Sequence, residues 1–199
     1  MNTTAKLLND FLGSTQVFAK AVNNVVEKRL LRAVAGNQVT FSQFRLLKLV
    51  ALTDSHNISD VAAFLGVSSA AASKTVDKLV RRGLLLRREG ETDRRAIELL
   101  LTPPSRRLLA EYEATKRRKL TKLFRQFPTE DLRRTAELLD RLSAGIVNHS
   151  ARPEEVCLQC GIYYRERCLV RELVGRNCFF RTHRTRRRLK GATKDNGAA

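Results

Sequence analysis

Long apolar runs are missing from this 199-residue sequence. None approaches the ~20 residues that a helix needs to cross a bilayer, so neither a membrane segment nor a membrane partner is expected. The first twelve residues include Asp10 and have neither a basic stretch nor a small-residue cleavage site, which argues against a secretory signal. We therefore expect a cytoplasmic protein.

Catalytic patterns are missing as well. The sequence shows no nucleophile paired with a base, no phosphate-binding loop and no constellation of carboxylates. It also has no internal repeat. An enzyme is therefore not expected, with neither catalytic residues nor a bound substrate.

Acidic residues are few: 20 Asp and Glu stand against 38 Lys and Arg, which gives a formal net charge of +18. Such an excess favours a polyanionic partner, because each neutralised phosphate releases a condensed counterion. From charge alone, nucleic acid is the first candidate and an anionic membrane surface the second; of the two we expect nucleic acid. The hydrophobic fraction of 43% is enough for a packed core, and the length suits one domain with an appendage.

Apolar residues recur at helical spacing through residues 5–34, and Gly36 follows where such a helix would end. An apolar stripe this wide must be buried against another large apolar surface. It fits a core helix and a dimerisation helix equally well. The stripe consists of Leu7, Leu8, Phe11, Leu12, Phe18, Val22, Val25, Val26, Leu30 and Leu31.

The next segment predicts a helix-turn-helix. A helix begins at Thr40, and a shorter one, with Ser59 as its N-cap, runs to Leu65. Residues 66–68 form a tight turn, after which a second helix extends to about Arg82. Val67, Val76 and Leu79 are expected to fill the seam between the two helices.

Two apolar runs, residues 84–88 and 96–101, flank a charged, glycine-containing tip and predict a hairpin. A hairpin directly after a recognition helix is a wing. Two further helices are expected over about 103–127 and 129–147, the first with proline in its first turn.

Several strings in this order resemble the MarR family of winged-helix regulators. They are FSQFRLL at 41–47, DVAAFLGVS at 60–68, SKTVDKLVRRGL at 73–84 and DRR at 93–95 leading to Leu101 and Thr102. The resemblance covers about residues 5–147. It implies a two-fold homodimer, built from the N- and C-terminal helices, that binds pseudo-palindromic double-stranded DNA. A small-molecule effector would fit the same scheme.

The recognition helix should lie in the major groove, with its N-terminal face toward base edges and phosphates. The candidate contacts on it are Ser68, Ser69, Ser73, Lys74 and Lys78. Lys74 is the residue expected to reach a base or a nearby phosphate, and one of the first two serines should cap the helix instead. Asp77 is expected to pair with Lys74, Lys78 or Arg81 on its own helix.

At the wing tip, Arg94 is expected to enter the minor groove and Arg95 to act as a structural partner. The resemblance implies that Asp93 holds the loop through an ion pair. A merely solvated tip is the alternative.

All four cysteines lie near the C-terminus, as Cys157, Cys160, Cys168 and Cys178. The first two form a C-x2-C knuckle followed by Gly161, and the set could supply four thiolates. Lone thiols at such spacings favour an iron–sulfur cluster slightly over zinc. Unligated thiols are the third interpretation.

The expected fold class is mainly α with a small β-wing, a winged helix-turn-helix flanked by N- and C-terminal dimerisation helices. Residues 1–148 would form the DNA-binding and dimerisation domain, with the helix-turn-helix at about 58–82 and the wing at about 84–101. Residues 149–190 would form a cysteine-containing segment with a basic arm, and 191–199 a disordered tail.

The function expected is sequence-specific transcriptional regulation, as a repressor, with a redox or metal response through the cysteines. Two alternatives are open: a metal- or redox-handling protein with a scaffold helix-turn-helix, and a non-specific nucleic-acid-binding protein. The second should show a steep salt dependence without a preferred site.

Overall fold

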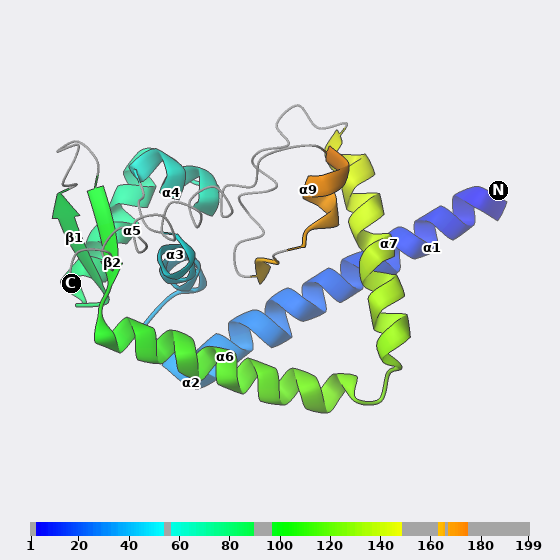
Figure 1. Ribbon diagram of the computed structural model, residues 1–199, viewed down its shortest axis with the longest axis horizontal. Coiled ribbons are helices and arrows are strands. Elements are labelled where there is room, and N and C mark those ends of the chain that lie inside the picture. Colours follow the sequence, from blue (N-terminus) through cyan, green and yellow to red (C-terminus); the bar gives the residue numbers. More distant parts are fainter. Residues whose placement is uncertain (1–2, 54–56, 90–96, 149–162, 166, 175–199) are drawn as a thin grey trace, which may run out of the picture.

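A computed structural model describes residues 3–53, 57–89, 97–148, 163–165 and 167–174. Its elements run in the order α1, η1, α2, α3, α4, α5, β1, β2, α6, α7 and α9 (Figure 1). The fold is mainly helical with one two-stranded antiparallel sheet, which confirms the expected fold class. Among the described helices, none combines the length and the apolar character that crossing a membrane requires.

The N-terminal helix is continuous but changes its winding. It consists of α1 (Thr3–Ala21), the π-helical segment η1 (Val22–Arg29) and α2 (Leu30–Ala35). From residue 22 onward the inward-facing side chains repeat every four residues, whereas an α-helix has 3.6 residues per turn. The wider winding of η1 keeps this stripe in line. Its members are Val22, Asn23, Val26, Glu27, Leu30, Leu31, Val34 and Ala35.

Local capping signals fix the helices that follow. Helix α3 (Phe41–Leu52) begins with a capping box between Thr40 and Gln43, as its sequence predicts. Helix α4 (Ile58–Leu65) is capped by Asn57, not by Ser59, because the Asn57 side chain accepts from the backbone N–H of Asp60 at 2.7 Å. The prediction of Ser59 as the cap is therefore wrong by two residues.

The turn between α4 and α5 (Ser69–Arg81) requires glycine. Gly66 has φ +68°, in the left-handed region that costs a residue without Cβ little. Val76 and Leu79 are fully buried, as expected of seam residues, whereas Val67 is 43% exposed. Val67 therefore lies outside the seam that it was expected to fill.

Strands β1 (Leu85–Glu89) and β2 (Ile97–Leu101) pair antiparallel, with Leu85 opposite Leu101 and Arg87 opposite Leu99. Leu85 and Leu99 point into the core, while Leu86, on the opposite face of the hairpin, is exposed. This alternation is the pattern of a hairpin with one buried face. It confirms the expected hairpin after α5.

Two long helices and a short one complete the described chain. Helix α6 (Pro103–Phe124) starts after the Thr102 cap with proline in its first turn, and α7 (Thr129–Asn148) follows after a short turn. Helix α9 (Leu169–Val174) lies beside the C-terminal half of α7 (Figure 1).

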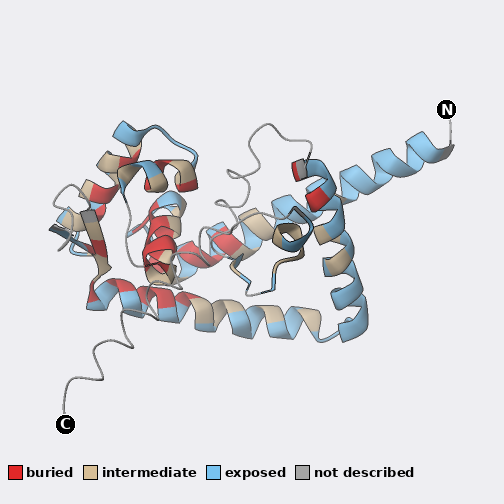
Figure 2. Cartoon of the chain, turned by 45° about the horizontal axis from the view of Figure 1, so that its top comes forward, coloured by how far each residue is buried: buried red, intermediate tan, exposed pale blue. Residues whose placement is uncertain are grey.

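The core lies among α2, α3, α4, α5, the sheet and the first half of α6. Its largest fully buried side chains include Tyr112, Phe44 and Phe64. Figure 2 shows the contrast with α1, which is exposed along nearly its whole length. The apolar stripe of the N-terminal helix is thus split: Leu30 and Leu31 belong to the core, whereas Leu7, Leu8 and Leu12 face solvent.

Candidate nucleic-acid interface

Helix α5 presents one face to the core and the other to solvent. Ala72, Val76 and Leu79 are completely buried, at the spacing of an inward-facing helical stripe. Lys74 and Lys78, four residues apart, are exposed on the outer face. An uncovered helix with two cations on its outer face has the shape and the charge that a DNA major groove accepts.

The serines expected at the start of α5 have different environments. Ser68 caps the helix, because its hydroxyl accepts from the backbone N–H of Ala71 at 3.3 Å. Ser69 is exposed and Ser73 is half-buried. Of the two capping candidates, the structure assigns the role to Ser68 and leaves the Ser69 side chain facing solvent.

Asp77 does not pair within its own helix as expected. Its carboxylate lies 3.3 Å from the guanidinium of Arg87 on β1. The prediction of a partner on α5 is wrong because Arg87, on the same face of β1 as the buried Leu85, comes close to Asp77 only in the folded chain. The pair joins α5 to β1, the first strand of the hairpin.

The tip of the wing, including Arg94 and Arg95, lies outside the described residues, so their expected minor-groove roles remain predictions. On the described part of the wing, Arg87 and Arg88 are exposed. Both belong to β1, which follows α5 through Gly83.

Two arginines that the sequence did not single out hold this region together. Arg82 donates from Nη1 to the backbone carbonyl of Gln38 at 2.5 Å, which ties the end of α5 to the loop before α3. Arg45 donates to the Phe64 carbonyl at 3.0 Å, and its guanidinium lies 5.0 Å from the centre of the Phe64 ring. Both contacts are long-range, so no local sequence signal could have identified them.

A polar cluster lies where η1, α3 and α6 meet. Burial raises the pKa of Glu27, although a hydrogen bond from Tyr163 and the charges of Arg45 and Lys116 act in the opposite direction. Burial also raises the pKa of the Tyr112 hydroxyl, and no hydrogen-bond partner for it occurs among the described residues.

Ion pairs on α6 belong to the same cluster. Glu113 pairs with Lys48 of α3 and, at 2.8 Å, with Lys116. Burial alone would raise the pKa of Glu113, but the hydrogen bonds from Lys116 and Lys48 outweigh it and the pKa falls. Lys116 also lies over the rings of Tyr112 and Tyr163, at 5.7 and 5.3 Å from their centres.

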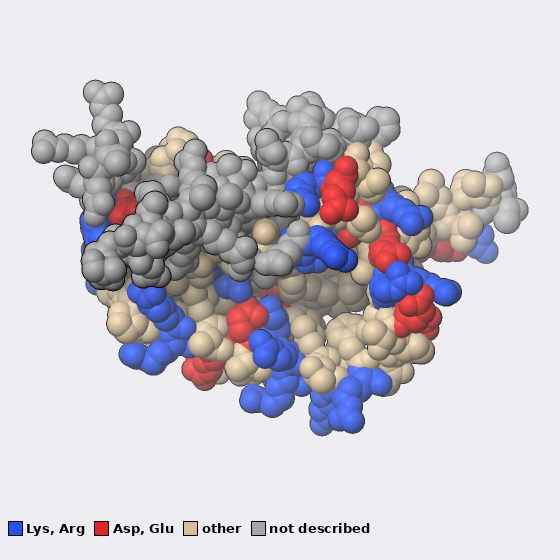
Figure 3. All heavy atoms as spheres, in the orientation of Figure 1, with Lys and Arg blue, Asp and Glu red and all other residues tan. Residues whose placement is uncertain are grey.

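Lys and Arg side chains line the lower edge of the molecule in Figure 3, over α6. Of the four consecutive basic residues 116–119, Lys116 turns inward and the other three are exposed. Four consecutive residues cannot share one helical face, so exposure of the other three is what the helix geometry requires.

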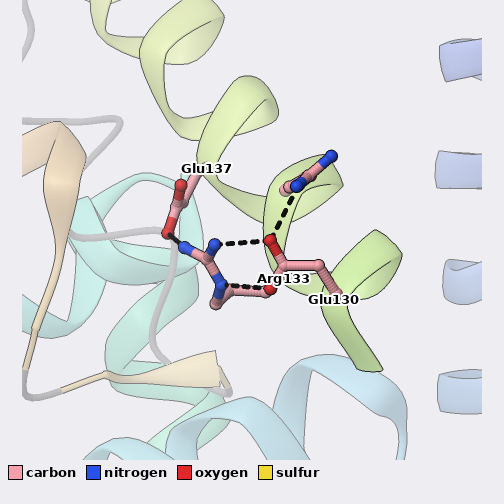
Figure 4. Close-up of polar contacts among 4 residues, drawn as sticks. Glu130, Arg133 and Glu137 are labelled. Atoms are coloured by element: carbon pink, nitrogen blue, oxygen red, sulfur yellow. Dashed lines mark hydrogen bonds and ion pairs between the residues drawn. The ribbon is translucent and has the colours of Figure 1, made fainter. Parts of the chain in front are cut away.

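A second surface cluster lies at the start of α7 (Figure 4). Arg133 donates to Glu130 through two nitrogens, at 2.7 and 2.9 Å, and also to Glu137. Hydrogen bonds from Arg133 and then from Arg134 lower the pKa of Glu130 to about 2. These are pairs three and four residues apart on an exposed helix, and we assign them to local support of α7.

Only Cys168 of the four predicted metal ligands is described. Its thiol is free and half-buried, just before α9. Cys157, Cys160 and Cys178 lie outside the described residues. In the described part of the chain no group of three or more His, Cys, Asp and Glu residues could hold a metal ion, so a four-thiolate site remains a prediction.

Comparison with known proteins finds a family match in the region of the helix-turn-helix and the wing. Residues 39–97, from two residues before α3 to the first residue of β2, match the MarR family. A comparison with curated proteins finds no match.

Solved structures share the fold. RV1404 from Mycobacterium tuberculosis is 22% identical, with a TM-score of 0.58 over 67% of this chain and 92% of that one. FabT from Streptococcus pneumoniae, in complex with DNA, is 19% identical, with a TM-score of 0.60 over 73% and 99%. A MarR transcriptional regulator from Methanosarcina mazei Go1 is 18% identical, with a TM-score of 0.54 over 71% and 99%.

Proposed function

We propose that the protein is a sequence-specific DNA-binding transcriptional regulator of the MarR type that acts as a homodimer and represses its targets, on the premise that residues 39–97 match the MarR family. The observation that carries the proposal is the uncovered outer face of α5, with Lys74 and Lys78 exposed beside the wing. FabT, which shares the fold, has been seen in complex with DNA.

In this proposal α5 enters the major groove. Lys74 reaches a base edge or a phosphate, and Lys78, one turn further along, contacts the backbone. Ser69 and Ser73 supply hydroxyl contacts, and Ser68 places the first backbone N–H groups of the helix toward a phosphate. Arg94 enters the adjacent minor groove and Arg95 supports the wing.

Exposed apolar side chains support the homodimer. They lie on α1, on the last turn of α6 and along α7, far from the winged-helix core (Figure 2). A second copy of the chain would cover them, since large apolar surfaces seldom stay exposed in a soluble monomer. The residues are Leu7, Leu8, Phe11, Leu12, Val17, Phe18, Leu123, Leu132, Leu138, Leu142 and Ile146.

Cys157, Cys160, Cys168 and Cys178 would make the regulator responsive to redox state or metal, through an iron–sulfur cluster or a zinc ion. Four clustered thiols in a chain with no other cysteine support this part of the proposal. Purification without oxygen, followed by metal and sulfide analysis, tests it. Iron with sulfide supports the cluster, one zinc per chain supports zinc, and a metal-free protein contradicts both.

DNA binding is tested by selecting a preferred duplex from a random pool and measuring protection of that site. Lys74→Glu should abolish protection, whereas Lys122→Glu, the same charge change on the exposed face of α6, should leave the preferred site protected. A wild-type protein that binds every duplex equally would favour the non-specific alternative. Binding no duplex would contradict the proposal.

The homodimer is tested by the solution mass. Leu12→Glu and Ile146→Glu together should lower the mass to that of one chain. Leu86→Glu, at an exposed leucine on the wing, serves as the control and should leave the dimer intact. A wild-type protein with the mass of one chain would contradict the homodimer.

A further inference from the structure

A short C-terminal segment joins three parts of the molecule. We call residues 163–165 and 167–174, which end in α9, the C-terminal strap. They follow the winged-helix domain in sequence and lie beyond the residues that match the MarR family. Even so, the strap packs back against the winged-helix core at one end and against α7 at the other.

Three consecutive strap residues face three different partners. Tyr163 lies under the ammonium of Lys116 on α6, 5.3 Å from its ring centre, and its hydroxyl lowers the pKa of the buried Glu27 carboxylate on η1. Tyr164 packs against the winged-helix core. Arg165 lies 2.7 Å from the Asp140 carboxylate on α7, which is only 13% exposed.

Helix α9 extends the contact along α7. Ala144 and Val147 of α7 are buried, yet neither belongs to the winged-helix core, and α9 is the described element on which α7 packs most extensively. With Asp140 they form one helical stripe, at spacings of four and three residues. The inner face of α7 is therefore covered chiefly by the strap.

We propose that the C-terminal strap is a conformational link that sets the position of α7 relative to the DNA-reading helix. One end is anchored at Glu27 and the winged-helix core, and the other holds α7 through Asp140 and α9. Releasing the strap frees α7 without disturbing α5.

The effect of the strap on DNA binding rests on the proposed function. If α7 helps to form the dimer, its angle to the winged helix sets the distance between the two reading helices. A dimer reads two half-sites at a fixed spacing, so the link governs affinity for paired half-sites more than for one alone. A change in the strap would therefore regulate DNA binding from outside the winged helix.

The link can be loosened with two small substitutions. Tyr163→Phe removes the hydroxyl that acts on Glu27 and keeps the ring beneath Lys116. Asp140→Asn removes the charge that holds Arg165. Glu172→Gln, an exposed acid on α9 that contacts only its neighbour Arg171 among the described residues, serves as the control.

Hydrogen exchange of the full-length protein without DNA tests the link directly. The double variant should speed exchange of α7 amides by about three- to tenfold, as expected for the loss of one polar side-chain interaction and one ion pair. Exchange in α5 should not change, and the control should match the wild type. Unchanged exchange in α7, or equal acceleration in α7 and α5, would overturn the proposal.

Duplexes taken from the selected site then test the consequence. The double variant should lose affinity for the paired half-sites and bind an isolated half-site as the wild type does. Equal loss on both duplexes, or none on either, would overturn the coupling to DNA binding. A wild-type protein that binds no duplex would refute the regulator proposal, and the exchange measurement would still decide the link.

Discussion

Asp77 on the recognition helix and Arg87 on the first wing strand form an ion pair at 3.3 Å, on the side of the molecule proposed to face DNA. Both side chains are substantially exposed, so the pair contributes little stability. Its location gives it a second effect. It keeps a negative charge beside the proposed phosphate path and engages an arginine that could otherwise reach a phosphate.

Asp77→Asn should therefore tighten DNA binding. The free energy of unfolding should change by less than about 1 kcal/mol, as for other exposed pairs. Affinity for a random duplex should rise roughly two- to fivefold, because repulsion between unit charges at contact in water is of order 1 kcal/mol. Urea unfolding and fluorescence anisotropy measure the two quantities. Weaker binding by a normally stable variant would show that Asp77 itself helps recognition.

Ser68 allows the capping role to be separated from the DNA role. Ser68→Ala should lower the free energy of unfolding by about 1 kcal/mol, because the N–H of Ala71 loses its acceptor. Ser68→Asp should keep the stability, since aspartate caps as well as serine, but should weaken DNA binding by placing a carboxylate at a phosphate site. Equal DNA affinity for the aspartate variant and the wild type would remove the start of α5 from the interface.

Tyr112 carries a buried hydroxyl with no partner among the described residues, while its ring lies 4.3 Å from that of Phe44. Tyr112→Phe should raise the free energy of unfolding by about 1 kcal/mol, because an unsatisfied buried polar atom is removed and the ring contact stays. Phe44→Leu, which loses the ring contact, should lower it by at least about 1 kcal/mol. Thermal unfolding of both variants tests this, and a destabilised Tyr112→Phe would reveal a partner for the hydroxyl.

Glu27 should make stability depend on pH. Its pKa in the folded protein is raised by burial, so the folded state binds its proton more tightly than the unfolded state does. Stability from this group is then greatest below the ordinary value of 4.5 and falls as pH rises through the raised pKa.

Glu27→Gln removes this titration and keeps an acceptor for Tyr163. The variant should gain stability relative to the wild type between pH 4 and pH 8, measured by urea unfolding at each pH. Among the described residues, the groups facing Glu27 include Asn23, Lys28, Arg45, Tyr112, Lys116 and Tyr163, and all remain in both proteins. A constant difference across this range would show that Glu27 is ionised to the same extent in the folded and unfolded states.

The order of helices and the hairpin follow from local signals in the sequence. Apolar spacing and the Thr40 cap place the helices, and the glycine at 66 places the turn of the helix-turn-helix. The cap of α4 was misplaced because Asn57 and Ser59 are both good caps two residues apart. Only the folded backbone, which turns at Asn57, decides between them.

Contacts between residues far apart in the sequence could not be predicted from these local signals. Nothing near Asp77 in sequence points to Arg87, and Glu27 has a helical neighbourhood that gives no sign of its burial beneath Tyr163. The outward lysines of α5 could be predicted, because their spacing from the buried Val76 and Leu79 fixes the exposed face. The roles of Arg45 and Arg82 depend on where distant carbonyl groups end up.

The wide winding of η1 also sets the direction in which the apolar stripe of α1 faces. A four-residue repeat advances each residue by about 90°, whereas ordinary winding would advance it by about 100°. Over the eight residues from Val22 to Arg29 the difference accumulates to about 80°. Substitutions that rewound these turns would swing the apolar stripe of α1 almost a quarter of a revolution around the helix axis, and so re-aim the surface proposed to form the dimer without altering any residue on it.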